Sequence, residues 1–441
     1  MKPYLWTRDS VILGKILLCS CAAIVFYFGF IFFLPLSQAM PVYDKPFFAI
    51  CKSAACRAIA PSKIKKLRDP FRKPSLLNDS EDISLGLSLR LNHLEGGKFV
   101  VPFKNGLKTI YTLNPSLQTG MKDYFKKNKV PYGVFVAMNP HSGKVLAFVE
   151  HSSKEPRAQH LALRATYPAA SIFKLITASA AIEERQAGPE TLIENFNPYH
   201  SAHTTLADAF AASDNNAFAE VGLRYLNTKL LIGYANRFKF NQKIPFELPI
   251  QVSKIRADNS KRGLANLAAG FGNVGLSPVH AALIGSAIAN NGVMVTPCLI
   301  DRVVTSSGKT VFACMPKVFA TAISAQTAAQ LRQMMGMTIT KGTARKVFQS
   351  AWKEPALREI AMGGKTGSLT GNNPPGKVSW FVGMAPLDDP EVVVSALIIN
   401  NNRSKKWQVK ASNVAKEGFR AYFDSKRKVR VALLGSVTKA E

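Results

Sequence analysis

Strand-like segments stand on both sides of a long helical stretch in this chain of 441 residues. Residues 108–149 contain runs rich in Val, Ile, Phe and Tyr, separated by a helical pattern and by turn signals. Strand-like runs return over residues 359–400. Helical patterns begin at residue 171 and continue to about 279. Helices between two contributions to one antiparallel sheet predict an α+β domain whose sheet is assembled from both ends.

The pattern Ser-x-x-Lys occurs six times, but only the copy at Ser171 opens a long apolar run. Pro168 precedes this run and Gly188-Pro189 ends it, which are start and stop signals of a helix. Residues three apart share one face of a helix, so the Lys174 amine is expected beside the Ser171 hydroxyl. A buried lysine of lowered pKa can take the serine proton and make a nucleophile. The alternative, a helix cap followed by a surface lysine, is our interpretation of the other five copies.

Two further short motifs follow in the chain, Ser213-Asp214-Asn215 and Lys365-Thr366-Gly367-Ser368. Each has an ordinary structural explanation, because the first could cap a helix over residues 216–225 and the second could be the edge of a strand. A given tripeptide arises by chance well under once in a chain of this length. Three such motifs in this order therefore favour a functional interpretation.

With these motifs the chain resembles the penicillin-binding proteins, specifically the transpeptidase domain of the class B type. The match covers about residues 106–425 and includes further segments: Tyr167–Ala170, Gly270–Asn273, Gly342–Ala344 and Trp380–Gly383. The resemblance implies a β-lactamase/transpeptidase-like fold, with an antiparallel sheet, helices on both of its faces and a central helical subdomain.

The resemblance also implies catalytic roles for five residues. Ser171 would be the acylated nucleophile and Lys174 its base. Ser213 would relay a proton to the leaving amine, and Asn215 would bind substrate or Lys174. Lys365 would help to hold the terminal carboxylate of the substrate.

The substrate-binding strand would consist of Thr366, Gly367 and Ser368. Thr366 would hold the substrate carboxylate together with the preceding lysine, and the N–H groups of Ser171 and Ser368 would form the oxyanion hole. Ala170 and Ser368 stand where the family usually has Gly and Thr, two mild departures. No metal and no cofactor is expected.

The function implied is a D,D-transpeptidase that attacks the penultimate D-alanyl carbonyl of a stem peptide, releases D-alanine and passes the acyl group to an amine. A D,D-carboxypeptidase or β-lactamase would use water instead, but Glu247-Leu248-Pro249 does not supply the deacylating Glu motif of class A lactamases. A third alternative is a non-turnover β-lactam sensor. The expected partners are peptidoglycan stem peptides, β-lactam antibiotics, the membrane and other cell-wall synthesis proteins, without nucleic acid.

Residues Ile16–Leu36 form an apolar run of 21 residues without a charge, long enough to span a bilayer as a single anchor. Lys2, Arg8 and Lys15 precede it, so residues 1–15 are expected in the cytoplasm and the catalytic part outside, in the periplasm or extracellular space. A cleaved signal peptide is the alternative, because Ser37-Gln38-Ala39 resembles a cleavage site.

The chain carries a formal net charge of +29, which favours an anionic neighbour such as the membrane or an acidic wall polymer. We predict a basic linker over residues 37–105 and a basic tail over 426–441. Class B relatives usually have a large pedestal domain where this linker stands, and the chain has too few residues there for a glycosyltransferase.

Cys298 and Cys314 flank an expected hairpin whose turn is Thr305–Gly308. They could form a disulfide, which would suit an oxidising compartment, or remain two buried thiols. Cys51 and Cys56 are a weaker candidate pair.

Overall fold

The computed structural model describes residues 93–102, 106–158, 160–194, 203–400 and 409–437, with the backbone alone for residues 429–437. The expected anchor over 16–36, most of the basic linker and the Cys51–Cys56 pair lie outside these residues. Within the described residues, no helix combines the length and the apolar character needed to cross a membrane.

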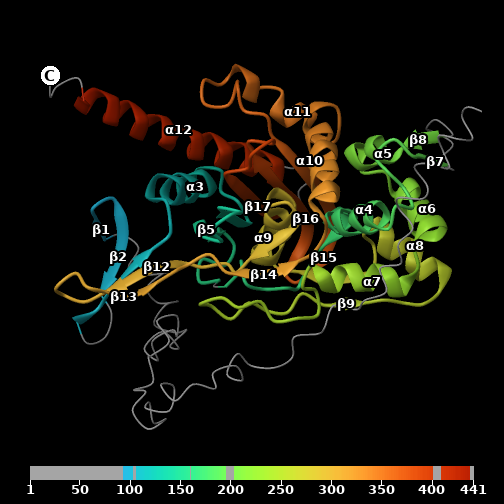
Figure 1. Cartoon of the computed structure of the whole chain (residues 1–441), viewed down its shortest axis with the longest axis horizontal. Helices are drawn as coiled ribbons and strands as arrows, with labels where there is room; N and C mark the ends of the chain where they lie inside the picture. The colour runs from blue at the N-terminus through green and yellow to red at the C-terminus, as the bar shows by residue number, and fades with distance from the viewer. Residues whose placement is uncertain (1–92, 103–105, 159, 195–202, 401–408, 438–441) are drawn as a thin grey trace, which may run out of the picture. The chain divides into compact units, whose positions relative to one another are not determined.

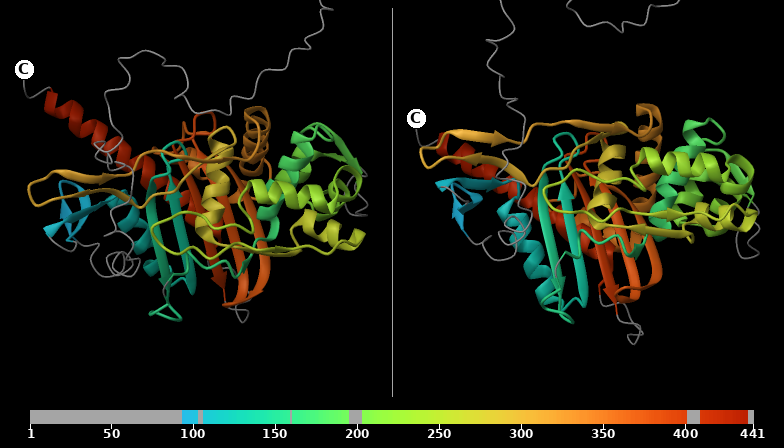
Figure 2. Two further views of the ribbon diagram at one scale, coloured as in Figure 1. Left: turned by 60° about the horizontal axis from the view of Figure 1, so that its bottom comes forward. Right: turned by 90° about the horizontal axis from the view of Figure 1, so that it is seen from below.

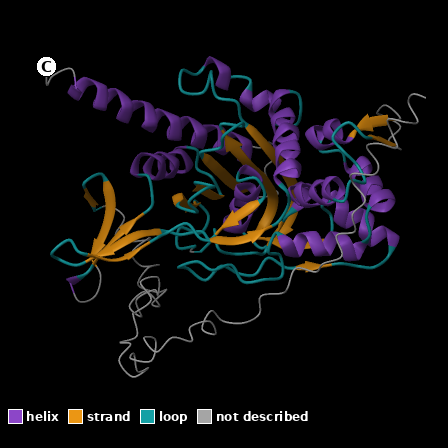
Figure 3. Cartoon of the chain, viewed as in Figure 1, coloured by secondary structure: helices purple, strands orange, loops and turns teal. Residues whose placement is uncertain are grey.

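The main sheet has five antiparallel strands in the order β15-β16-β17-β4-β5. Two strands come from the N-terminal part of the domain and three from the C-terminal part: β4 (Tyr132–Met138), β5 (Val145–Ser152), β15 (Gly363–Asn372), β16 (Pro375–Ala385) and β17 (Val392–Asn400). The pairing of β17 with β4 joins the two groups, as the sequence predicted, and Figure 3 shows the strands side by side.

Helices cover both faces of this sheet. Successive residues of a strand point to opposite faces, so Val134 and Val136 of β4 enter one apolar cluster and Phe135 and Ala137 enter the other. The first face packs against α9 (Pro278–Ala289), in which all twelve residues are buried. The second packs against α3 (Pro115–Lys127) and α12 (Ala411–Val437). Figure 2 shows α9 in yellow and α12 in red on opposite sides of the strands.

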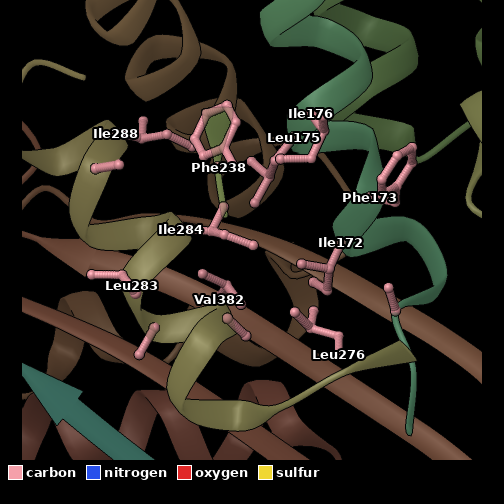
Figure 4. Packing of buried hydrophobic residues seen from close by; sticks show 14 of the residues in the cluster. Ile172, Phe173, Leu175, Ile176, Phe238, Leu276, Leu283, Ile284, Ile288 and Val382 are labelled. Atoms are coloured by element: carbon pink, nitrogen blue, oxygen red, sulfur yellow. The ribbon is translucent and has the colours of Figure 1, made fainter. Parts of the chain in front are cut away.

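A helical subdomain follows β5 and contains α4 at its centre (Figure 1, green). Its helices are α4 (Lys174–Glu183), α5 (Leu206–Ala212), α6 (Asn215–Tyr225), α7 (Thr228–Arg237) and α8 (Lys261–Ala269). Nine of the ten residues of α4 are buried. Ile172 and Ile176 pack toward Ile284 of α9 (Figure 4), so the core holds the start of α4 against the sheet.

The remaining elements connect these layers. They are β6 (Tyr167–Pro168), η5 (Ala170–Phe173), β7 (Leu192–Glu194), β8 (His203–Thr205), β9 (Ile255–Arg256), β10 (Asn273–Leu276), β11 (Val293–Val295), β14 (Val318–Thr321), α10 (Ala325–Thr340), α11 (Arg345–Phe348) and η6 (Ala351–Lys353). The strands β6, β10 and β9 form a small sheet in that order.

A second five-stranded sheet corrects the expected end of the basic linker. Its order is β1-β2-β3-β12-β13, with β1 (Leu94–Glu95), β2 (Lys98–Pro102), β3 (Lys108–Tyr111), β12 (Ile300–Val304) and β13 (Thr310–Ala313). Residues 94–102, which the sequence placed in the linker over 37–105, therefore belong to the folded domain. The run Phe99–Val101 is buried against β3, but it is too short to give a sustained periodicity.

The C-terminal end also differs from the prediction of a tail over residues 426–441. Helix α12 continues to Val437. Charges three and four residues apart support it, because Arg420 pairs with both Glu417 and Asp424, and Arg427 pairs with Asp424 at 3.5 Å. Lys426, Arg427 and Lys428, three of the basic residues that suggested a tail, are therefore exposed residues of a helix.

Cys298 and Cys314 are joined in a disulfide, which decides between the two alternatives that the sequence left open. Cys298 precedes β12 and Cys314 follows β13, so the bond closes the base of the expected hairpin. The two cysteines are 16 positions apart in the chain. The disulfide therefore restrains the ends of β12 and β13.

Replacing both cysteines by Ala is expected to lower the free energy of unfolding by about 3 kcal/mol, because a bond across a loop of this length restricts the unfolded chain. Urea unfolding with and without a reductant measures the effect. The reductant should destabilise the wild-type protein to the level of Cys298→Ala/Cys314→Ala and leave the variant unchanged. Equal stability of the two oxidised proteins would contradict the prediction.

Candidate active site

The turn that carries Ser171 is fixed on both sides. Ser171 lies in the 3-10 turn η5, which follows the pairing of β6 with β10 and leads into α4 at Lys174. Ala170 has a φ of 49°, in the left-handed region that favours glycine. This backbone conformation explains physically why a glycine is common at this position in proteins that this chain resembles.

A close contact with Gly270 supports the same turn. Gly270 has a φ of 91°, and a Cβ atom added there would lie 2.4 Å from the carbonyl oxygen of Ala170. Only a glycine leaves room for the carbonyl group immediately before the nucleophile. The segment that follows α8 therefore fixes the backbone on which Ser171 stands.

Lys174 is fully buried, which contradicts the alternative of a surface lysine after a helix cap. Its Nζ donates hydrogen bonds to Ser171 Oγ at 2.9 Å, to Asn215 Oδ1 at 2.7 Å and to the Ala269 carbonyl at 2.9 Å. Burial lowers the pKa of Lys174 to about 7, although the charge of Asp214 raises it in part. An amine of this pKa has a substantial neutral fraction near pH 7 and can accept the serine proton.

The motif Ser213-Asp214-Asn215 combines a cap with site residues. Ser213 ends α5 in the left-handed region with a φ of 58°, and Asp214 caps α6 by accepting the N–H groups of Asn216 and Ala217. The capping interpretation is thus correct for the aspartate. The same turn directs Asn215 toward Lys174 and Ser213 toward Lys365.

Lys365 lies on β15, which is the edge strand of the main sheet as expected. Its buried Nζ donates to Ser213 Oγ at 2.8 Å and to the Thr366 carbonyl at 3.2 Å. Burial lowers the pKa of Lys365 well below its usual value, and the charge of Lys174 lowers it further. The site therefore disfavours the state in which both lysines are charged.

Close approach of β15 to η5 brings the third motif to the first. A Cβ atom at Gly367 would lie 3.2 Å from the Ile172 side chain, so a larger residue would push the strand away. Trp380, which pairs with Gly367 from β16, donates its indole N–H to the Pro168 carbonyl at 2.9 Å. The sheet and the nucleophile turn are thereby tied together.

These residues surround a pocket of about 500 Å³. The lining residues are Ala170, Ser171, Ser213, Asn215, Ala269, Gly270, Phe271, Thr343, Thr366, Gly367, Ser368, Ser379, Trp380, Lys410 and Ser412. Among the described residues, no Asp or Glu lines it. The described part of the chain also holds no group of three or more His, Cys, Asp or Glu residues that could bind a metal ion.

Thr343 is a site residue that the sequence reasoning missed. Its hydroxyl shares a hydrogen bond of 2.6 Å with the Thr366 hydroxyl at the pocket wall. The sequence did contain a signal for this residue, because the segment Gly342–Ala344 was part of the resemblance to the family. No role was assigned to that segment. Two neighbouring hydroxyl groups beside a lysine can bind a carboxylate.

Residues 133–421 match the model of a protein family, the penicillin binding protein transpeptidase domain. The chain belongs to this family.

Known relatives agree with this assignment. The peptidoglycan D,D-transpeptidase PbpA of Mycolicibacterium smegmatis is 28% identical over 314 residues, which is 60% of this chain and 61% of that protein. The D,D-transpeptidase domain of a peptidoglycan glycosyltransferase from Eggerthella lenta is similar in structure, with a TM-score of 0.62 and 26% identity over 74% of this chain and 85% of that one.

Penicillin-binding protein A of Mycobacterium tuberculosis, solved as a penicillin G acyl-enzyme complex, shares the fold with a TM-score of 0.60 and 22% identity. That comparison covers 71% of this chain and 80% of the solved one. The chain matches only about three fifths of the length of the Mycolicibacterium relative, so the activity of the whole relative does not transfer directly.

Proposed function

We propose that this protein is a peptidoglycan D,D-transpeptidase that works through an acyl-enzyme on Ser171 and is inhibited by β-lactams. The observation that carries the proposal is the buried Lys174 amine, which is hydrogen-bonded to both Ser171 Oγ and Asn215 Oδ1. Family membership and the similarity to a named D,D-transpeptidase support the substrate class.

In the first step the neutral Lys174 amine takes the Ser171 proton, and the serine oxygen attacks the penultimate carbonyl of the stem peptide. The N–H groups of Ser171 and Ser368 stabilise the oxyanion. The bond to the leaving D-alanine then breaks, Ser213 gives its proton to the leaving amine, and the proton held by Lys174 replaces it on Ser213, so the acyl-enzyme again has a neutral Lys174. The Lys365 ammonium group, which donates to Ser213 Oγ, favours this transfer by stabilising the oxygen that loses the proton.

The terminal carboxylate of the substrate is held by Thr343, Thr366 and the charge of Lys365. An anion beside Lys365 raises the pKa of its amine, so substrate binding favours the ammonium form. A charged Lys365 in turn keeps Lys174 neutral, because the two amines repel each other when both are charged. Binding of substrate thus prepares Lys174 to act as the base.

In the second step an amine from a neighbouring stem peptide attacks the ester and restores free Ser171. The neutral Lys174 amine takes the proton that the attacking amine loses and gives it to the serine oxygen as the ester bond breaks. Hydrolysis by water needs a positioned base, and the described residues that line the pocket include no carboxylate for this purpose. This composition favours transfer over hydrolysis.

The direct test is acylation by a labelled penicillin followed by intact-mass and peptide mass spectrometry. The label should appear on Ser171 alone, be absent in Ser171→Ala, and persist for minutes or longer after excess drug is removed. Label on another serine would refute the assignment of the nucleophile. Recovery of free protein within seconds, with many equivalents of penicillin hydrolysed, would show a β-lactamase instead.

The rate of penicillin acylation should rise with pH and level off above a midpoint near pH 7. The pKa of Lys174 is lowered to about 7, and only its neutral form can take the Ser171 proton, so the active fraction grows as pH rises through that value. Acylation rates from pH 5.5 to 9 at constant ionic strength measure the profile, and circular dichroism checks that the fold persists. A rate that falls or stays constant over this range would contradict the role of Lys174.

We also propose that the catalytic domain works outside the cytoplasm, anchored by residues 16–36. The Cys298–Cys314 disulfide supports an oxidising compartment. Protease digestion tests the proposed location in cells whose outer envelope is permeabilised and whose cytoplasmic membrane is intact. The catalytic domain should be cleaved while a cytoplasmic marker survives. Protection of both would refute the proposed location.

A further inference from the structure

A second cavity of about 510 Å³ lies next to the active-site pocket. Three chain segments line both spaces, because residues 165–171, 269–275 and 366–373 each contribute some residues to one and some to the other. The lining residues of the second cavity are Ala165, Thr166, Pro168, Lys254, Arg256, Gly272, Asn273, Val274, Gly275, Thr370, Gly371, Asn372 and Asn373. It is therefore a continuation of the active site along β15, and we call it the distal groove.

The distal groove is held in shape by direct contacts. The Thr166 hydroxyl donates to the Asn373 carbonyl at 3.1 Å, which ties the turn after β15 to the segment before the nucleophile. A Cβ atom at Gly371 would lie 3.3 Å from the ring of Pro168, so the strand and β6 are in close contact. Strand β10 lies between β6 and β9, and this small sheet forms the opposite wall.

Lys254 and Arg256 give the groove its charge. They flank Ile255, which is only 8% exposed, so the two basic side chains lie on the opposite face of β9. Both are exposed, and among the described residues neither side chain has a hydrogen bond or ion pair with another residue. Two unpaired cations in a preformed groove fit a ligand with a carboxylate.

The direction of the bound substrate indicates which carboxylate this is. Under the proposed function the terminal carboxylate lies at Thr366 and the reacting carbonyl at Ser368, so the rest of the donor peptide continues toward Thr370 and Asn372. An extended chain advances about 3.3 Å per residue. The third and fourth residues from the C-terminus of the peptide therefore reach the distal groove.

We propose that Lys254 and Arg256 bind a free carboxylate on the third or fourth residue from the C-terminus of the donor peptide. This inference rests on the proposed function and adds a specificity site to it. Acidic donor peptides bind better than their amidated counterparts because both cations can pair with the free carboxylate.

The test uses synthetic peptides that end in D-alanyl-D-alanine and carry either a carboxylate or a carboxamide at the third or fourth residue from the C-terminus. Each peptide is scored by the concentration that halves the rate of Ser171 acylation by labelled penicillin. In the wild-type protein, the peptide whose carboxylate reaches Lys254 and Arg256 should protect Ser171 at a concentration about fivefold lower than its amide does. Two exposed ion pairs supply a difference of this size. In Lys254→Gln/Arg256→Gln the two should protect equally.

The control variant Lys309→Gln/Lys317→Gln removes the same charge from two exposed lysines that line neither space, and it should keep the wild-type preference. A penicillin with an uncharged side chain should acylate all three proteins at the same rate, because that side chain offers no carboxylate to Lys254 or Arg256. Equal protection by acid and amide in the wild-type protein, or a preference that survives in Lys254→Gln/Arg256→Gln, overturns the inference. Failure of penicillin to label Ser171 in the wild-type protein would instead refute the proposed function.

Discussion

Replacement of Lys174 by Met should slow the acylation of Ser171 on the order of a thousandfold, which is the range expected when a general base is removed. Met fills a similar volume without an amine, so the Ser171 proton loses its acceptor while the buried space stays occupied. Intact-mass kinetics with labelled penicillin measure the rate, and thermal unfolding checks that the variant remains folded.

Lys353→Met is the matched control for this prediction. Lys353 belongs to another Ser-x-x-Lys copy, which begins at Ser350, but its side chain is exposed. Its replacement should leave the acylation rate unchanged. A folded Lys174→Met protein that reacts at the wild-type rate would show that another group takes the serine proton.

Replacement of Gly270 by Ala should both destabilise the protein and slow acylation more than tenfold. A left-handed conformation costs a residue with a side chain about 1–2 kcal/mol, and here the added Cβ atom would also lie 2.4 Å from the Ala170 carbonyl oxygen. Relief of that contact must move the backbone that precedes Ser171. Urea unfolding and penicillin acylation measure the two effects.

Gly233→Ala provides the comparison, because Gly233 lies inside α7 and an added Cβ atom would meet nothing within 4 Å. This variant should keep the wild-type acylation rate and be equally or slightly more stable. If Gly270→Ala behaves in the same way as Gly233→Ala, the turn before the nucleophile is not held by this contact.

The apolar run around Lys174, bounded by Pro168 and Gly188, was sufficient to predict that this Ser-x-x-Lys copy lies on a buried helix. It was also sufficient to place β4 and β17 in one sheet and Lys365 on a strand. Periodicity and turn residues are local signals, and these elements are long enough to show them. The roles assigned to the site residues remain predictions.

Other features depend on contacts that a single sequence does not display. The pairing of Thr343 with Thr366 joins residues 23 positions apart through the approach of α10 to β15. The left-handed conformation of Ala170 is set by its neighbours, since alanine itself disfavours it. Strands as short as β1 and β9 have two residues each and carry no detectable pattern. Tertiary contacts, rather than local preference, decide all three.

The order of strands in the main sheet has a consequence for how the molecule is made. Strand β17 pairs with β4 on one side and β16 on the other, so the hairpin of β4 and β5 lacks its neighbour until residue 400 has been synthesised. Ser171 and Lys365 are both synthesised before this pairing can form. A nascent chain that ends before β17 therefore exposes an unpaired apolar edge and needs protection from aggregation. Refolding of the complete domain is correspondingly expected to be slow, because the pairing of β17 with β4 closes a loop of more than 200 residues.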